Sequence, residues 1–415
     1  MRRIALGICL LLLISALSDR LAAQGWRGFK NAPAGESGQK YADGSAVCAT
    51  ETHICALKGE YNEVYFYDPA GDSWICVSVL PFVGRSGLRV PARTGASLAS
   101  VGSTIYCVKG GRTLEFWSAI PDSEGKYVWR QGPDVPAGPY NLKVGAGAAL
   151  TALDSFVYLL KGNGSGEFYR YSTIGCVWSA MADIPVGASG KGVAGGGALA
   201  STPDGLLCLK GNNSSEFYAW DPSADEWTSL NPVPPGASGR AVGTGASLAF
   251  SSGVAYCLKG NSTVEFWPYS VTSGTWGPAA SDYPHERRAT GEGAGLCSYE
   301  DYVYALAGDL TDEFWGYRLP VAVNERPAGN WQGTRLMVFP NPSHGIVSVK
   351  LPSECAGRGI TVSDVHGRVV QRRCTTSQSR IDLRSLADGV YLLSLEGQFG
   401  AAVEKIVLSR RGDER

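Results

Sequence analysis

Short apolar runs separated by polar turns recur along most of the chain. In one stretch the runs cover residues 245–250, 254–259 and 265–269, and a fourth begins at Trp276. Each run has the length of a β-strand, and the Gly-Asn-Ser sequence at 260–262 is typical of a hairpin turn. The pattern predicts a unit of four short antiparallel strands, which we name a to d.

A Lys-Gly pair ends strand b of five units, and a Glu follows five or six residues later. A sixth copy has Ala307-Gly308 in place of the Lys-Gly pair, and the successive intervals are 51, 52, 49, 49 and 48 residues. Self-similarity at such a period indicates an array of equivalent supersecondary units. The repeated hairpin positions are Lys58, Glu63, Lys109, Glu115, Lys161, Glu167, Lys210, Glu216, Lys259, Glu265 and Glu313.

The sixth unit ends after strand c, at Tyr317, without a strand d that begins with Trp. Near the N-terminus, Trp26 and Pro33 stand seven residues apart, which is the Trp-to-Pro spacing of strand d in four other units. Residues 26–33 are therefore predicted to supply the outer strand of the last unit and to cover an edge that would otherwise be exposed. Trp331 is a competing candidate, but its distance from Tyr317 does not fit.

Six such units predict an all-β, six-bladed β-propeller closed by an N-terminal strand. The units resemble kelch repeats in Trp-Asp-Pro at 220–222 with Trp227, and in Tyr-Asp-Pro at 67–69 with Trp74. The resemblance covers about residues 26–318. It departs from the family where Lys-Gly replaces the usual double Gly, which puts the known functions of kelch proteins in doubt for this chain.

The C-terminal region has a different pattern, with alternating strands and its own turn motifs. Phe-Pro-Asn-Pro-Ser at 339–343 is followed by Gly-Arg-Val-Val at 367–370 and Gly-Val-Tyr at 389–391. These motifs resemble the sorting domain of the type IX secretion system of Bacteroidota. The resemblance implies a small Ig-like β-sandwich that the secretion machinery recognises at the outer membrane, with cargo released or attached to the surface. The matching positions include Pro340, Asn341, Pro342, Gly345, Gly367, Arg368, Gly389, Tyr391 and Lys405.

The N-terminus has the features of a secretory signal peptide. Arg2 and Arg3 precede an apolar run at 4–17, which is short for a membrane span. No later segment is apolar enough to cross a membrane, so we expect an exported chain without a transmembrane segment. The predicted divisions are a signal peptide at 1–23, the propeller at 24–320, a linker at 321–335, the sorting domain at 336–410 and a tail at 411–415.

Charge divides the chain into an acidic body and a basic C-terminal region. Residues 24–334 hold 22 basic and 29 acidic side chains, net −7, whereas residues 335–415 carry a net +4. An acidic body argues against nucleic acid as a partner. Basic residues nevertheless recur in the crossovers from strand d to strand a, where they could ring the mouth of the channel and attract acidic ligands. They are Lys40, Arg93, Lys143, Lys191, Arg240 and Arg288.

The repeated charges have structural alternatives. The hairpin Lys and Glu face each other across strands b and c, and a cross-strand ion pair is the favoured interpretation. Solvated loop charge is the alternative for the crossover bases. The four His residues are scattered, without the spacing of metal ligands, and we expect neither a metal nor a cofactor. In an exported chain, Cys48–Cys55 and Cys355–Cys374 are disulfide candidates.

These observations favour a secreted or surface-attached binding module, with an acidic glycan or a protein as its ligand. The repeats supply symmetric charges and no singular catalytic group, so no catalytic residue is assigned. The alternatives are a propeller-type hydrolase or lyase acting on glycans, and a purely structural surface protein. A catalytic function would require clustered carboxylates with shifted pKa values near the axis.

Overall fold

The computed structural model describes residues 25–284, 290–319, 337–339, 343, 345–350, 359–364, 369–374, 378–397 and 400–408. The predicted signal peptide and C-terminal tail, and the predicted linker at 321–335, lie outside the described residues. Contacts divide the chain into two compact units, Met1–Val321 and Ala322–Arg415. Within the described residues, no helix is long and apolar enough to cross a membrane.

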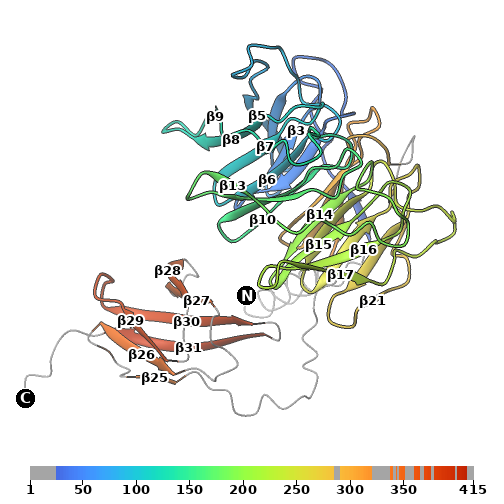
Figure 1. Cartoon of the computed structure of the whole chain (residues 1–415). Coiled ribbons are helices and arrows are strands. Elements are labelled where there is room, and N and C mark those ends of the chain that lie inside the picture. The colour runs from blue at the N-terminus through green and yellow to red at the C-terminus, as the bar shows by residue number, and fades with distance from the viewer. Residues whose placement is uncertain are drawn as a thin grey trace, which may run out of the picture. The chain divides into compact units, whose positions relative to one another are not determined.

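The first unit has a β-propeller-like architecture, in which each repeat forms one four-stranded antiparallel sheet. The sheets follow one another in chain order, from blue to orange in Figure 1. Sheets 1 to 3 consist of β2 (Ala46–Ala49), β3 (Ile54–Leu57), β4 (Glu63–Asp68) and β5 (Ser73–Val79); β6 (Ser97–Val101), β7 (Thr104–Val108), β8 (Phe116–Pro121) and β9 (Tyr127–Gln131); and β10 (Ala149–Leu153), β11 (Phe156–Leu160), β12 (Phe168–Ser172) and β13 (Val177–Ala180).

Sheets 4 to 6 repeat this order, with one exception at the end of the series. Sheet 6 takes its fourth strand from the N-terminus, because β1 pairs antiparallel with β24 through Trp26↔Tyr317 and Gly28↔Trp315. The strands are β14 (Ala198–Thr202), β15 (Gly205–Leu209), β16 (Phe217–Asp221) and β17 (Glu226–Leu230); β18 (Ser247–Ser251), β19 (Val254–Leu258), β20 (Phe266–Ser270) and β21 (Thr275–Trp276); and β22 (Gly295–Tyr299), β23 (Tyr302–Leu306), β24 (Phe314–Arg318) and β1 (Trp26–Gly28).

Six apolar clusters fill the spaces between consecutive sheets. One of them packs Tyr67 and Ile54 of sheet 1 against Tyr304 and Phe314 of sheet 6, so the last sheet contacts the first as the others contact their neighbours. The innermost strands likewise touch in cyclic order: β2 contacts β6 on one side and β22 on the other. Burial of these aromatic and aliphatic side chains is the main source of stability in this unit.

Glycines set how closely the innermost strands approach each other. One glycine precedes each of these strands with φ between +76° and +90°, a region in which other residues are strained. A Cβ on Gly245 would overlap the backbone of Gly291 in the next sheet, and a Cβ on Gly293 would overlap Ala42 of sheet 1. The six members of this glycine ring are Gly44, Gly95, Gly147, Gly196, Gly245 and Gly293.

A tryptophan on each outer strand ties its sheet to the preceding one. The Trp227 indole N–H donates to the Ala182 carbonyl at 2.8 Å, and Trp178 and Trp276 likewise donate to a carbonyl of the preceding sheet. Trp129 donates to the Ser78 hydroxyl at 3.0 Å instead. In sheets 6 and 1, Trp26 donates to the Ser281 carbonyl at 2.9 Å and Trp74 to the Lys30 carbonyl at 2.8 Å. Trp26 therefore has the place in sheet 6 that the other tryptophans have in sheets 1 to 5.

The second unit contains two antiparallel sheets over one apolar core. The core joins Val347 and Ile381 of the first sheet to Leu393 and Ile406 of the second. One sheet has the order β25 (Met337–Phe339), β26 (Ile346–Lys350) and β29 (Gln378–Asp382); the other has β28 (Val369–Cys374), β27 (Gly359–Asp364), β30 (Gly389–Gly397) and β31 (Gly400–Leu408).

The glycine ring can be tested with two alanine variants that share backbone strain and differ in the space available. Gly253 has φ +81° with open space around its Cβ position, whereas Gly245 has φ +83° and faces the Gly291 backbone. We expect Gly253→Ala to lower the free energy of unfolding by about 1–2 kcal/mol and Gly245→Ala by about 3 kcal/mol or more. Urea unfolding measures both, and equal losses would show that close approach between sheets contributes little.

Candidate functional site

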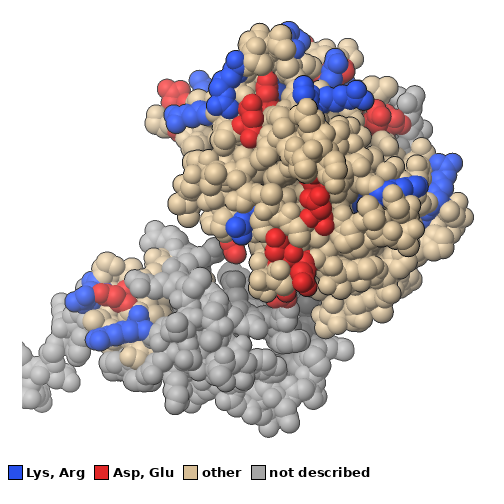
Figure 2. All heavy atoms as spheres, viewed as in Figure 1, with Lys and Arg blue, Asp and Glu red and all other residues tan. Residues whose placement is uncertain are grey.

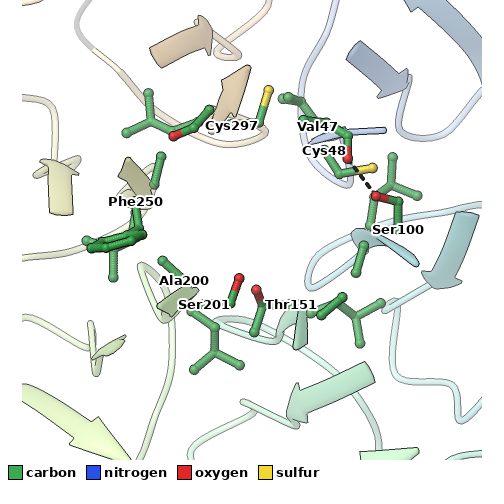
Figure 3. A pocket seen from close by; sticks show the side chains of 18 residues that line it. Val47, Cys48, Ser100, Thr151, Ala200, Ser201, Phe250 and Cys297 are labelled. Atoms are coloured by element: carbon green, nitrogen blue, oxygen red, sulfur yellow. Dashed lines mark hydrogen bonds between the residues drawn. The ribbon is translucent and has the colours of Figure 1, made fainter. Parts of the chain in front are cut away.

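The innermost strands surround an open channel in the first unit. A cavity of about 210 Å³ is lined by three consecutive residues from each of these six strands. In Figure 3 the side chains form a circle, and the hydroxyls of Thr151 and Ser201 point into its centre. The hydroxyl of Ser100 instead donates to the Ala49 carbonyl at 2.6 Å. The channel wall is therefore a mixture of apolar, hydroxyl and thiol groups without a charged side chain.

The hairpin charges are buried ion pairs. Lys161 and Glu167 illustrate the arrangement, with Nζ and Oε2 3.0 Å apart and side chains 0% and 1% exposed. The same ammonium donates to the carbonyls of Pro136 at 2.8 Å and Ala137 at 2.6 Å. Lys58, Lys109, Lys210 and Lys259 form the equivalent pairs with Nζ–Oε2 distances of 2.7 or 2.8 Å.

Each of these pairs joins the b–c hairpin to the crossover that enters the same sheet. In sheet 4, Lys210 donates to the Pro185 carbonyl at 3.0 Å. Glu216 in turn accepts bonds from the backbone N–H of Ser189 at 2.9 Å and from its hydroxyl at 2.7 Å. The repeated hairpin Lys and Glu side chains thus hold the crossover against the hairpin.

The pKa of Glu216 reflects this set of partners. Burial alone would raise it, but the hydrogen bonds from Lys210 and Ser189 outweigh burial and hold the pKa at about 2, below its ordinary value of 4.5. A carboxyl whose pKa is lower in the folded state stabilises the fold fully above the unfolded value. The contribution of this pair is therefore present above about pH 4.5 and is lost as the pH falls towards 2.

Sheet 6 departs from the others because Ala307 stands where they have Lys. Glu313 is nevertheless buried, with the Trp315 indole N–H 3.4 Å from its Oε2. The crossover into this sheet includes residues 285–289, outside the described residues, and Arg288 of the predicted basic ring is among them.

The described crossover bases are all exposed, and their partners differ from one sheet to the next. Lys40 lies 3.2 Å from Asp312, and Arg93 lies 3.7 Å from Glu60, so these two bases are paired with acidic side chains. The pair formed by Lys40 joins sheet 1 to sheet 6. Both pairs are largely solvent-exposed and stabilise the fold little.

On sheets 3 to 5 the crossover bases have no acidic partner among the described residues. Lys191 donates to the carbonyls of Asn212 and Asn213, both at 3.1 Å, and Arg240 donates to the Asn261 carbonyl at 2.8 Å. Lys143 is exposed on the same kind of crossover. Lys143, Lys191 and Arg240 therefore form what we call the basic arc, whose charge no described carboxylate neutralises.

Acidic residues gather on the opposite part of the ring, at sheets 6 and 1, a feature that the sequence analysis missed. Burial and the nearby Asp43 and Asp309 raise the pKa of Glu292. Asp43 also accepts two bonds from Thr94 of the next sheet, from the hydroxyl at 2.6 Å and from the N–H at 3.0 Å. Figure 2 agrees with a mixed surface, in which basic and acidic side chains are interspersed on the visible face.

The described cysteines of the first unit are free thiols. Cys48 and Cys55 lie directly opposite each other in the β2–β3 hairpin, and both are buried. Cys107, Cys208 and Cys257 are buried in strand b of three other sheets, as small apolar side chains often are. The predicted Cys355–Cys374 pair includes Cys355, which lies outside the described residues.

The sorting-domain positions are described in part. Gly345 has φ +119° and lies against Arg384, where a Cβ would meet the Arg384 side chain. Tyr391 is buried in the core of the unit and donates to the Ala387 carbonyl at 3.0 Å. Gly389 begins β30, and Lys405 lies in β31. Pro340, Asn341, Pro342, Gly367 and Arg368 lie outside the described residues.

The described residues contain no group of three or more His, Cys, Asp and Glu side chains placed to hold a metal ion. The crossovers between the sheets, which we call the crossover face, carry exposed basic side chains and exposed apolar residues such as Leu88, Tyr140 and Val186. Charged and apolar groups fixed in this way are suited to binding an extended ligand.

The structural role of the hairpin pairs can be tested at Lys210. Replacing Lys210 with Met leaves the half-buried Glu216 carboxylate without its cation, and we expect the free energy of unfolding to fall by about 3 kcal/mol. Lys210→Met combined with Glu216→Gln should recover much of that loss. Lys126→Met, in an exposed pair with Glu124, is the control and should change stability by less than about 1 kcal/mol. Urea unfolding distinguishes these outcomes, and a harmless Lys210→Met would contradict the structural role.

Comparison with solved structures gives similarity at the level of the fold. The structure of YjhT matches with a TM-score of 0.51 and 11% identity, over 69% of this chain and 95% of that one. A structural genomics protein of unknown function from Bacteroides thetaiotaomicron matches with a TM-score of 0.50 and 11% identity, over 71% of this chain and 76% of that one. The comparison with curated proteins found no match.

The C-terminal region matches a family model. Residues 337–409 match the model of the secretion system C-terminal sorting domain. This confirms the resemblance that the motifs of this region suggested, and it indicates a secreted or outer-surface destination. The chain thus carries a β-propeller-like unit and, at residues 337–409, a type IX secretion system C-terminal sorting domain.

Proposed function

We propose that this chain is a binding module, delivered by its sorting domain to the medium or the cell surface. Its first unit is a six-bladed, kelch-like propeller that β1 closes, and its second is a small Ig-like β-sandwich that the secretion machinery recognises. A signal peptide at 1–23 takes the chain across the inner membrane. The crossover face of the propeller binds an acidic ligand, either a glycan or a protein.

The observation that carries this proposal is that the hairpin lysines are buried in ion pairs, whereas the crossover bases are exposed. The five hairpin lysines are completely buried in ion pairs and have no access to a ligand. The bases of the basic arc are exposed, and carbonyls hold the ammonium of Lys191 and the guanidinium of Arg240. A carbonyl orients a cation and leaves its full charge in place, so the arc can attract an anionic group.

Of the six bases predicted to ring the channel mouth, only those of the basic arc, on sheets 3 to 5, are proposed to contact the ligand. Lys40 and Arg93 are paired with Asp312 and Glu60, which lowers the positive potential at sheets 6 and 1. An acidic polymer is therefore expected to bind along the crossovers of sheets 3 to 5, where the bases have no described acidic partner. Uronic acid or sulfated glycans and acidic protein segments have the required charge.

The binding proposal can be tested with the triple variant Lys143→Ala, Lys191→Ala and Arg240→Ala. We expect labelled polygalacturonate to bind the mature protein at low salt, and the triple variant to bind roughly tenfold more weakly or worse. Binding to the unchanged protein should weaken as ionic strength rises. Fluorescence anisotropy titrations give these dissociation constants.

The matched control is Lys30→Ala with Lys126→Ala and Arg130→Ala, which removes the same charge from residues on or beside the outer strands. Equal binding by the triple variant, or an equal loss in the control, would contradict a role for the basic arc. Assays for new reducing ends and unsaturated products in the same samples test the alternative that the chain is a hydrolase or lyase. A purely structural protein would bind none of the acidic polymers tried.

A further inference from the structure

Sheet 1 breaks the symmetry of the repeats at two positions that face each other. Four other sheets have Tyr where sheet 1 has Cys55, three residues before the Lys or Ala that follows strand b. On strand a, the residue opposite is Cys48, whereas the opposing pairs in sheets 2 and 3 are Ala99↔Tyr106 and Thr151↔Tyr158. Sheet 1 thus has two thiols at the positions where sheets 2 and 3 have a small residue opposite a tyrosine.

The geometry of this hairpin suits a covalent bond between the two thiols. The Thr50 N–H donates to the His53 carbonyl at the turn, so Cys48 and Cys55, two residues further along each strand, are a hydrogen-bonded pair. Such pairs have Cα atoms about 5.5 Å apart and side chains on the same face. Disulfides span Cα separations of about 4.4–6.8 Å. Cys48 and Cys55 also belong to one buried cluster, together with Cys107 of sheet 2.

We propose that Cys48 and Cys55 form a redox-active dithiol, which is oxidised to a disulfide when the chain is exported. The oxidant is a disulfide of the thiol–disulfide exchange class, such as an envelope oxidoreductase or glutathione disulfide. This inference goes beyond the binding proposal and depends on the export that the sorting domain indicates.

The reaction starts with one thiolate attacking the disulfide of the oxidant, which forms a mixed disulfide and releases the first leaving thiolate. The second cysteine then attacks the mixed disulfide, closes Cys48–Cys55 and releases the second thiol of the oxidant. Two protein thiols lose two protons and two electrons, and the oxidant disulfide gains them. No metal ion or further reactant is needed.

The two cysteines differ in their access to an oxidant. Cys48 lines the channel and is 8% exposed, whereas Cys55 is fully buried. Burial and the neighbouring Cys48 thiol raise the pKa of Cys55 well above its ordinary value, so Cys55 is a poor first nucleophile in the folded protein. Cys48 therefore makes the first attack, and Cys55 resolves the mixed disulfide.

The sequence allows a direct test by peptide mapping. Trypsin cleaves after Lys40 and Lys58, so both cysteines fall in peptide 41–58, whereas Cys107 falls in peptide 94–109. The full chain is purified after export without reductant, denatured, treated with iodoacetamide and digested. We expect peptide 41–58 to lack alkylation and to be lighter by two hydrogens than the reduced peptide.

The internal controls are Cys208 and Cys257, which lie opposite Leu199 and Leu248 and should be alkylated completely. Full alkylation of Cys48 and Cys55 in the exported protein would overturn the proposal. A cross-link between peptides 41–58 and 94–109 would overturn it as well, because Cys107 would then be the partner.

Stability gives a second measurement that remains informative if export is poor. Reduced protein is incubated with glutathione disulfide, and its urea midpoint is compared with that of the reduced form. We expect oxidation to raise the midpoint of the unchanged protein and to have no effect on Cys48→Ala with Cys55→Ala. Cys208→Ala should keep the oxidation-dependent shift, and an identical midpoint in both redox states of the unchanged protein would contradict the disulfide.

Discussion

The first unit depends on how closely each innermost strand approaches the backbone of the next. The left-handed glycines before these strands allow that approach, because a Cβ on Gly196 or Gly293 would overlap the neighbouring backbone. Close approach at the centre leaves room for aromatic side chains further out, where Tyr67, Phe314 and their equivalents fill the spaces between sheets. The tryptophan bonds at the outer strands then fix the same neighbours at the rim.

The buried Lys–Glu pairs hold the crossover loops on this frame. Burying a charge is costly unless it is paired, and each of the five buried lysines has a carboxylate within 3.0 Å. In three sheets the carboxylate also binds the backbone of a crossover serine, as Glu63 binds Ser37. The loops are thereby ordered without using the exposed bases, which leaves the basic arc available to a ligand. This division between buried and exposed charge links the fold to the proposed function.

Much of this organisation could be predicted from the sequence because it repeats. The interval between Lys-Gly pairs predicted the four-stranded units, and the Trp26–Pro33 spacing directed attention to the strand that pairs with β24. The sorting domain was evident because its motifs are local in the sequence. The sequence could also predict that Lys161 faces Glu167, because the two residues flank one hairpin and are close in the chain.

The partners of the crossover bases could not be predicted in the same way. Lys40 pairs with Asp312, 272 residues away, and that contact exists only because sheet 6 lies beside sheet 1. The acidic residues near Glu292 likewise come from two different sheets. The sequence could not reveal which crossover bases are paired, because neighbouring repeats contribute the acids.

The most direct test of this account is the contribution of the N-terminal strand to sheet 6. The first unit without residues 25–33 is compared with the complete first unit by hydrogen–deuterium exchange and thermal unfolding. Pairing of β1 with β24, and the bonds of Trp26 and Trp74, predict faster exchange in β24 and β5 and a lower melting temperature. Adding the peptide 25–33 should restore part of the protection. Unchanged exchange in β24 together with an unchanged melting temperature would contradict closure of the propeller by its N-terminal strand.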